Sequence, residues 1–244
     1  MDFKRLQEAK NEIKTCKRFV FLGGAGVSTA SGISDFRSPQ GLYNVRSKYG
    51  VPYETMLSHD YFEENPETFY DFYWSTMVNS KAKPNKAHFA LAEFSKSLNL
   101  VTVTQNIDGL DIESGQKIVL EVHGSVKRYF CPICERKFSL DELTPSGVPH
   151  CKNCGAILKP DVILYGEPLD EDTLLNAIAS VKMADCLIIG GTSMNVYPIA
   201  SLPNYFNGKL MIMINKEATT YDKYCKYVFH EDIGETLDYL LGGK

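Results

Sequence analysis

The residues whose spacing most clearly indicates chemistry are two Cys-x-x-Cys pairs, Cys131 with Cys134 and Cys151 with Cys154. Each pair can turn two thiolates toward one ion, so the two pairs supply the four sulfur ligands of a tetrahedral zinc site. Because sulfur would fill all four positions, we expect a structural zinc and not a catalytic one. The metal would stabilise a segment that has too few apolar residues for a core of its own.

A second candidate is the glycine-rich stretch LGGAGVSTASGISDFR, which continues the apolar run of residues 19–22. Gly24 and Gly26 would let backbone N–H groups approach a phosphate, and a helix beginning after them would favour negative charge. Thr29 stands where the usual dinucleotide fingerprint has its third glycine, and no clear strand ending in Asp or Glu follows about 20 residues later. These departures weaken a hydride-transfer interpretation. A plain strand-to-helix turn remains the alternative at this point.

Polar residues also follow two further apolar runs. Residues 105–108, Gln-Asn-Ile-Asp, come directly after residues 100–104, and His123 follows residues 118–122. Packing alone explains such groups poorly at the end of a core strand. A histidine titrates near neutral pH and suits a general base, although a lone histidine is more often structural. His123 is therefore a candidate base, with the structural interpretation still open.

The elements that must hold these residues alternate along the chain. Helical periodicity predicts helices over residues 2–16, 86–98, 169–182 and 234–241. Apolar runs predict buried strands over residues 19–22, 100–104, 118–122, 185–189 and 209–214. This alternation is typical of a doubly wound parallel sheet, whose ligands bind at the carboxyl ends of the strands. In residues 39–84 we expect short helices and no clear strand, and residues 125–160 show little helical periodicity.

Composition limits the class of protein. With 244 residues, 44% of them hydrophobic and 23% charged, the chain is an ordinary globular protein of one large domain, or one domain plus a small insert. Its net charge of −4 gives no reason to bind nucleic acid or a membrane surface, and we expect neither partner. The seven cysteines argue against a disulfide framework. With no secretory, lipidation or spanning segment, we expect a cytoplasmic protein, and we expect a monomer. The unpaired cysteines should be core thiols: Cys16, Cys186 and Cys225.

Taken together, the ordered motifs resemble the bacterial-type sirtuin family of NAD-dependent protein deacylases. The resemblance covers about residues 15–241, and its carriers are the two cysteine pairs, residues 24–37, 83–88, 104–110, 122–124, 159–167, 191–193 and 232–235, and Asn215. It implies an α/β fold with a Rossmann-like doubly wound parallel sheet, built from residues 1–38, 85–124 and 161–244. It also implies a smaller domain, made of a helical insertion (39–84) and a zinc ribbon (125–160). NAD and an acyl-lysine peptide would bind between the two domains.

The resemblance further implies a role for individual residues. His123 would be the general base, and Asn106 the second catalytic residue. The residues implied in NAD binding are Gly24, Ala25, Gly26, Thr29, Asp35, Phe36, Arg37, Gln105, Asn106, Ile107, Asp108, His123, Gly191, Thr192, Ser193, Asn215 and Ile233. Those implied in binding the acyl-lysine peptide are Val162, Ile163, Leu164, Tyr165, Gly166, Glu167 and Val196. The structural zinc ion would be held by Cys131, Cys134, Cys151 and Cys154.

The implied activity is NAD-dependent protein-lysine deacetylation or deacylation. Nicotinamide leaves NAD, the acyl oxygen attacks the freed ribose carbon, and free lysine and 2′-O-acyl-ADP-ribose are released. Within this chemistry Asp108 would bind the carboxamide of nicotinamide, and residues 35–37 would belong to a loop that closes over the ribose and excludes water. Two alternatives remain: transfer of a single ADP-ribose to a protein, and a catalytically silent reader of acyl-lysine.

Three departures from the family pattern qualify the resemblance. Residues 111–114, Asp-Ile-Glu-Ser, replace a commoner His followed by Ala-Gly. Residues 163–165, Ile-Leu-Tyr, replace a commoner Val-Trp/Phe-Phe run and leave the acyl preference open. The Tyr-x-x-Arg pattern associated with acidic acyl groups is missing from residues 70–76, which argues against succinyl or malonyl substrates.

Overall fold

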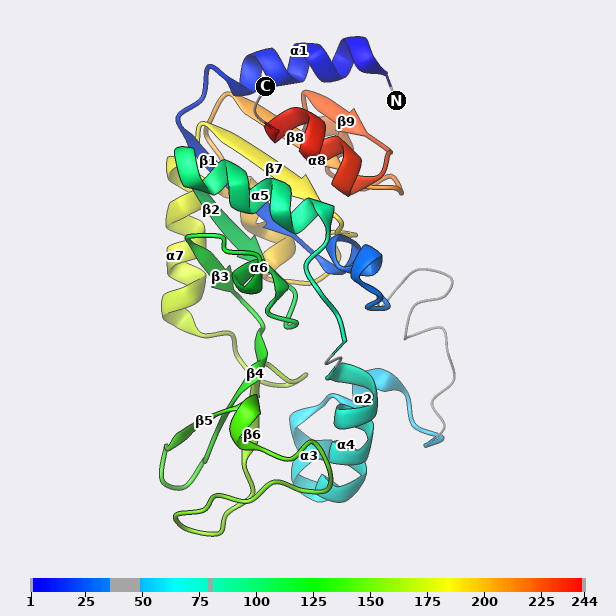
Figure 1. Ribbon diagram of the computed structural model, residues 1–244, viewed down its shortest axis with the longest axis vertical. Helices are drawn as coiled ribbons and strands as arrows, with labels where there is room; N and C mark the ends of the chain where they lie inside the picture. The colour runs from blue at the N-terminus through cyan, green and yellow to red at the C-terminus, as the bar shows by residue number, and fades with distance from the viewer. Residues whose placement is uncertain (1, 36–48, 79–80, 243–244) are drawn as a thin grey trace.

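A sheet of six parallel strands forms the centre of the larger part of the molecule (Figure 1). The computed structural model describes residues 2–35, 49–78 and 81–242. In spatial order the strands are β3 (Val119–Glu121), β2 (Asn99–Thr104), β1 (Arg18–Gly23), β7 (Cys186–Gly190), β8 (Leu210–Ile214) and β9 (Tyr227–Phe229). The chain moves outward from β1 in one direction and from β7 in the other. The carboxyl ends of these two central strands therefore form the switch point where ligands bind in such sheets.

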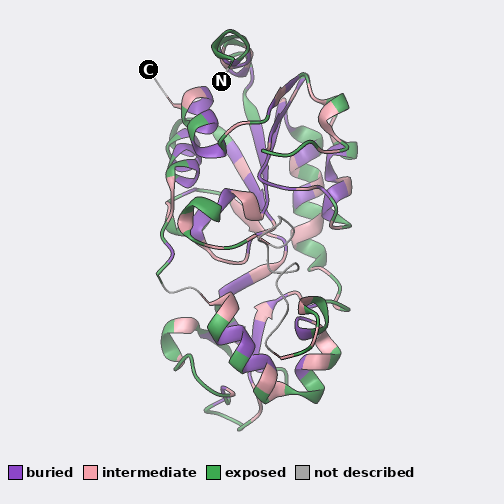
Figure 2. Cartoon of the chain, turned by 90° about the vertical axis from the view of Figure 1, so that its right-hand side faces the viewer, coloured by how far each residue is buried: buried purple, intermediate pink, exposed green. Residues whose placement is uncertain are grey.

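Helices cover both faces of this sheet because successive side chains of each buried strand point in opposite directions. Phe19 and Phe21 of β1 pack with α1 (Phe3–Ile13), α5 (Lys86–Ser97) and α8 (Ile233–Leu241). Val20 and Leu22 pack on the other face with α7 (Glu171–Met183) and the 3₁₀ helix η6 (Ile199–Tyr205). Figure 2 shows this sheet and the inner faces of its helices as buried. None of the described helices is long and apolar enough to cross a membrane.

The smaller part combines a ribbon with short helices. Its antiparallel sheet has the order β5 (Lys137–Ser139), β4 (Gly124–Phe130) and β6 (Lys159–Val162). Beside it lie α2 (Tyr53–Met56), α3 (His59–Glu64) and α4 (Pro66–Phe72), followed by a π-helical turn η4 (Tyr73–Met77).

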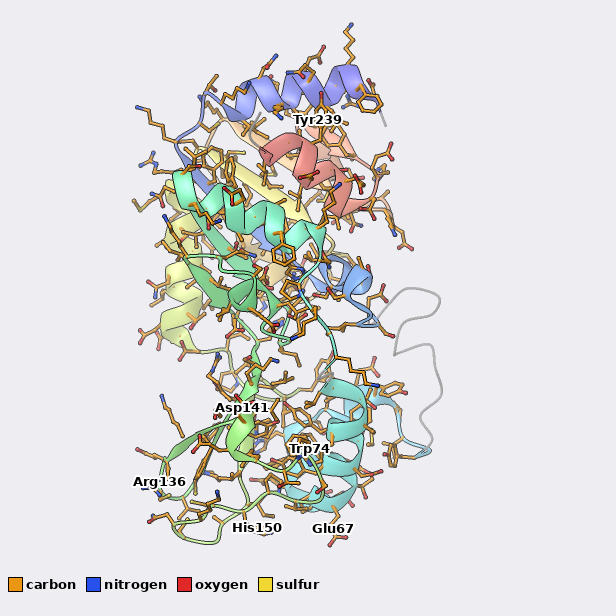
Figure 3. The ribbon with its side chains drawn as sticks, in the orientation of Figure 1. Glu67, Trp74, Arg136, Asp141, His150 and Tyr239 are labelled. Carbon is orange, nitrogen blue, oxygen red and sulfur yellow. The ribbon has the colours of Figure 1, made fainter. Side chains whose placement is uncertain are left out.

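One aromatic core holds the helices and the ribbon together. Tyr70 and Trp74 are packed against Tyr129 of β4. The Tyr70 hydroxyl donates a hydrogen bond to the carbonyl of Leu158, and Trp74 Nε1 donates to the carbonyl of Gly147 over 2.8 Å. Figure 3 shows Trp74 between the helices and the ribbon. These two hydrogen bonds join segments that are 88 and 73 residues apart in sequence, so the helices and the ribbon form a single packed unit.

The predicted fold class is confirmed, and the differences lie in short elements. Apart from the helix expected after the glycine loop, the predicted helices and parallel strands are present, although the first helix ends at Ile13 and the edge strand β3 has only three residues. Residues 49–78 contain no strand, as predicted. The sequence interpretation missed β9, the three ribbon strands and the short helix α6 (Leu110–Glu113).

Candidate active site

The carboxyl ends of the central strands open into one large cleft between the two parts of the molecule. Its volume of 1610 Å³ exceeds the roughly 300–1,000 Å³ of an ordinary small-molecule site, so it could admit two ligands together. Phe36 and Arg37 lie outside the described residues. The remaining residues assigned to NAD or peptide all border this cleft: Gly24, Ala25, Gly26, Thr29, Asp35, Gln105, Asn106, Ile107, Asp108, His123, Val162, Ile163, Leu164, Tyr165, Gly166, Glu167, Gly191, Thr192, Ser193, Val196, Asn215 and Ile233.

The glycine loop after β1 is pressed against the loop after β7. The Gly26 N–H donates to the carbonyl of Gly191 over 2.8 Å, and a Cβ on Gly26 would lie 2.8 Å from Gly191 Cα. Gly191 itself has a φ of +61°, which favours glycine. The N–H groups of Gly24 and Gly26 already bond to strand β7 and its loop. A phosphate would therefore meet the N–H of Ala25, which has no hydrogen-bond partner among the described residues.

The predicted helix after this loop is wrong. Two separate 3₁₀ turns follow, Ala25–Val27 and Thr29–Ser31, and Gly32 ends the second in a left-handed conformation with φ +79°. The short turns leave Ser28 between them, buried beneath the loop.

A buried hydrogen-bond network joins this loop to the end of β2. Ser28 Oγ donates to Asp108 Oδ2 over 2.7 Å, and Asn106 Nδ2 donates to Ser28 Oγ over 3.1 Å and to the Gly24 carbonyl over 3.2 Å. The other Asp108 oxygen accepts the N–H of Leu110 at 2.8 Å. The network fixes the carboxylate toward the cleft. The sequence analysis did not identify Ser28 as a site residue. Only the position of Ser28 inside the glycine-rich stretch could have indicated it.

His123 follows β3 closely, and one of its ring nitrogens is held by the backbone. Its Nδ1 is 3.0 Å from the carbonyl of Gln105. A carbonyl only accepts hydrogen bonds, so Nδ1 carries the proton and Nε2 of the neutral ring keeps a lone pair. Burial lowers the pKa of His123, and the hydrogen bond to Gln105 offsets part of that effect. The imidazole is therefore neutral and able to accept a proton at pH 7.

The position that departs from the family pattern, Asp111, is buried behind this network. Asp111 Oδ1 accepts a 2.8 Å hydrogen bond from Gln116 Nε2, and Gln116 Oε1 accepts one from Thr102. Burial raises the pKa of Asp111 and lowers the pKa of the nearby His88. The glycine that follows, Gly115, keeps a turn with φ +91°.

The four ribbon cysteines form a candidate metal site. Their sulfur atoms all lie within 4.8 Å of one another, close to the spacing of about 3.8 Å that tetrahedral ligation at about 2.3 Å requires. The two pairs repeat one turn: Cys131 N–H donates to Arg136 and Cys151 N–H to Ala156, over 2.9 and 2.8 Å. Four converging thiols with matched turns suit a tetrahedral, thiophilic ion. The three other cysteines lie elsewhere; Cys16 and Cys186 are buried, as expected, while Cys225 is half-buried.

The fold and the cleft define an α/β nucleotide-binding protein with a Cys₄ ribbon, and the comparisons with known proteins agree. The model of the Sir2 family matches residues 24–198. Proteins named NAD-dependent protein deacetylase from Clostridium acetobutylicum and Clostridium tetani are 44% and 47% identical to the chain. They cover 97% and 93% of it, and 98% and 94% of themselves. The chain belongs to the Sir2 family, the sirtuins.

Solved structures of Sir2 proteins share the whole architecture. One, described as a study of the mechanism and regulation of Sir2 enzymes, superposes with a TM-score of 0.87 at 33% identity, covering 98% of this chain and 96% of its own. Another, described as Sir2–p53 peptide–NAD⁺, superposes with a TM-score of 0.82 at 34% identity over 97% and 96%.

Proposed function

We propose that the chain is an NAD-dependent protein-lysine deacetylase, and more broadly a deacylase, that releases nicotinamide and 2′-O-acyl-ADP-ribose. The observation that carries this proposal is the shared cleft, which His123, Asn106 and Asp108 border together with residues 162–167. Relatives at 44% and 47% identity carry the name NAD-dependent protein deacetylase. A related Sir2 structure is described as holding a deacetylated p53 peptide with 3′-O-acetyl-ADP-ribose.

Three residues of the chain would have separate roles at the reacting ribose. NAD supplies the glycosidic bond that breaks and the sugar that accepts the acyl group. Asp108, held by Ser28 and the Leu110 N–H, keeps lone pairs with which to accept the carboxamide of nicotinamide. Asn106 lies between the glycine loop and β2, where it would orient the ribose. His123 Nε2 would take the proton of a ribose hydroxyl as that oxygen attacks the acyl carbon.

The adenosine end of NAD would lie across the ends of β7 and β8. Gln105 Nε2 donates to Thr192 Oγ1 over 3.1 Å. This hydrogen bond links the loop after β2 to the loop after β7. Asn215 follows β8 and borders the same cleft as Ile233 at the start of α8. This arrangement supports the assignment of residues 191–193, Asn215 and Ile233 to NAD binding.

The peptide would bind by adding a strand to the segment after β6. Among the described residues, the N–H and carbonyl of Gly166 have no backbone hydrogen-bond partner, so both are left for an extended peptide. Val162 and Leu164 are buried and apolar, which favours a neutral acyl-lysine over a charged lysine. Val196 borders the cleft as the predicted second side of the peptide site. Apolar acyl groups, acetyl or longer, are the proposed substrates.

Further features belong to the same proposal. The ribbon cysteines would hold one structural zinc ion. Residues 1–38, 85–124 and 161–244 would form the NAD-binding domain, and residues 39–84 and 125–160 the smaller one. Paired thiols suited to zinc persist in a reducing compartment, which favours the cytoplasm. We propose that the protein acts as a monomer.

The decisive experiment mixes the protein with NAD and acyl-lysine peptides of graded chain length and identifies every product by mass. The proposal requires nicotinamide, free lysine peptide and acyl-ADP-ribose together. Labelled ADP-ribose attached to protein without any acyl-lysine would favour ADP-ribosyl transfer. Tight peptide binding with no nicotinamide release at high NAD would favour a silent reader.

A further inference from the structure

The carboxylate of Glu167 joins the proposed peptide segment to both the ribbon and the helical insertion. Its Oε1 lies 2.8 Å from His59 Nδ1, and its Oε2 lies 3.0 Å from Lys159 Nζ. Oε2 also accepts a 2.9 Å hydrogen bond from the Leu164 N–H. Three contacts with the protein's own chain therefore occupy a side chain at the edge of the cleft.

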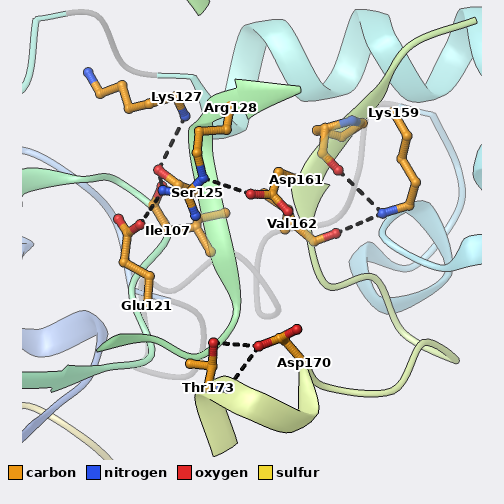
Figure 4. A network of polar contacts seen from close by, with 11 residues as sticks. Ile107, Glu121, Ser125, Lys127, Arg128, Lys159, Asp161, Val162, Asp170 and Thr173 are labelled. Atoms are coloured by element: carbon orange, nitrogen blue, oxygen red, sulfur yellow. Dashed lines mark hydrogen bonds and ion pairs between the residues drawn. The ribbon is translucent and has the colours of Figure 1, made fainter. Parts of the chain in front are cut away.

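Lys159, which faces the Glu167 carboxylate, is also held by hydrogen bonds. Its buried ammonium donates to the carbonyls of Pro160 and Val162 over 3.3 and 3.0 Å (Figure 4). Burial raises the pKa of Glu167, but the Leu164 N–H, His59 and Lys159 together hold it below its ordinary value. The carboxylate is therefore ionised. An ion pair between a buried ammonium and a half-buried carboxylate, with its hydrogen-bond partners in place, restrains the geometry of the surrounding chain.

His59 holds the same segment from the helical side. It begins α3, and its backbone N–H donates to the carbonyl of Tyr165 over 2.9 Å. The Tyr165 N–H in turn donates to the carbonyl of Leu57 over 2.9 Å, so Ser58 and Tyr165 form a single parallel bridge. The remaining ring nitrogen of His59 faces Glu63 at 3.3 Å, on the surface. Backbone and imidazole thus converge on residues 164–167 from α3.

We propose that His59, Glu167 and Lys159 are positioning residues that hold residues 164–167 in the shape that receives the acyl-lysine peptide. The inference rests on the proposed function. In it, the Glu167 carboxylate holds the backbone of the peptide-binding segment in place and does not itself contact the peptide. Tyr165, Gly166 and Glu167 border the cleft on the side of the smaller part, whereas the NAD residues follow the strands of the large sheet. Loss of the His59 contact should therefore weaken peptide binding and leave NAD binding unchanged.

Two substitutions of His59 test this role, and both introduce a side-chain amide. His59→Asn keeps an N–H donor close to the place of Nδ1, whereas His59→Gln places its donor close to Nε2, away from Glu167. We expect His59→Gln to raise KM for an acetyl-lysine peptide about threefold to tenfold, since it removes a hydrogen bond to a charged group. Its kcat and its KM for NAD should stay unchanged, and His59→Asn should restore the KM. Glu63→Gln, which changes only the exposed neighbour of Nε2, is the matched control.

Peptide affinity measured directly separates this inference from the proposed function. Fluorescence anisotropy of a labelled acetyl-lysine peptide, with a melting curve for each variant, gives the readout without turnover. Equal peptide affinity in wild type and His59→Gln overturns the inference while deacetylation stands, even if the variant melts earlier. Wild type that binds peptide more tightly than His59→Gln but releases no nicotinamide supports the inference and rejects the activity. Wild type that binds no peptide rejects both.

Discussion

His123 Nδ1 lies 3.0 Å from the backbone carbonyl of Gln105, and this contact leaves Nε2 as the basic atom of the ring. Replacing His123 with alanine removes the base and leaves the other residues assigned to NAD in place. We expect His123→Ala to lower deacetylation by about 10²–10⁴-fold, the usual worth of general base catalysis. NAD should still bind, as measured by calorimetry, because the remaining residues assigned to NAD are unchanged. Near-normal turnover in the variant would remove His123 from the mechanism.

The pH dependence of the reaction should carry the signature of the same histidine. Burial lowers the pKa of His123 below its ordinary value of 6.5. A base must be unprotonated, so activity is lost only as the pH falls through this lowered pKa. We expect the acid limb of log kcat/KM against pH to have its midpoint below 6.5. A midpoint clearly above that value would mean that another group limits the reaction.

Metal removal should unfold the ribbon before the large sheet. Four thiolates bind zinc with a free energy that is also folding free energy. We therefore expect one zinc per chain by elemental analysis, and loss of both metal and stability in Cys131→Ser. Cys225→Ser, which changes a half-buried thiol outside the cluster, is the control and should keep its metal. A metal-free wild type with an unchanged melting curve would contradict the assignment.

The buried carboxyl of Asp111 should cost stability when it is ionised. Burial raises its pKa, so the folded state binds its proton more tightly than the unfolded state does. This contribution to stability is present at low pH and is lost as the pH rises through the folded-state pKa. Asp111→Asn should therefore raise Tm by about 2–4 °C at pH 8, equivalent to roughly 1 kcal/mol in a chain of this size.

The sign of this effect is tested by repeating the measurement in acid. The advantage of Asp111→Asn should shrink as the pH falls toward the ordinary carboxyl pKa of 3.8, because the wild-type carboxyl, whose pKa is raised by burial, is then protonated and neutral. A gain that grew as the pH fell would reverse the inferred direction. The Gln116 amide can donate to Asn as it does to Asp111, so the hydrogen bond does not bias the comparison.

The large sheet could be predicted because each of its main strands is a continuous apolar run. The run 19–22 is buried on both faces of the sheet, and that pattern leaves little choice but a central parallel strand. The ribbon strands gave no such signal. β5 has only three residues, and β6 includes a proline in Lys159–Val162. Their positions depend on the cysteine turns and on the aromatic core supplied by Tyr70 and Trp74.

The candidate site was predictable where its residues follow strands. Asn106 and His123 follow shortly after β2 and β3, so the fold alone brings them to one edge. The contact between His59 and Glu167 spans 108 residues of sequence and joins a helix start to a loop. Neither residue sits in a periodic pattern that would reveal its partner. Such contacts follow from tertiary packing and could not have been predicted from local sequence.

The most direct test of the central claim is the balance of products when NAD is consumed. Purified protein with NAD and an acetyl-lysine peptide should release nicotinamide, free lysine peptide and acetyl-ADP-ribose in equal amounts, as measured by liquid chromatography and mass spectrometry. The account also predicts no peptide deacetylation without NAD. Free acetate formed in the absence of NAD, or deacetylated peptide without matching nicotinamide, would contradict it.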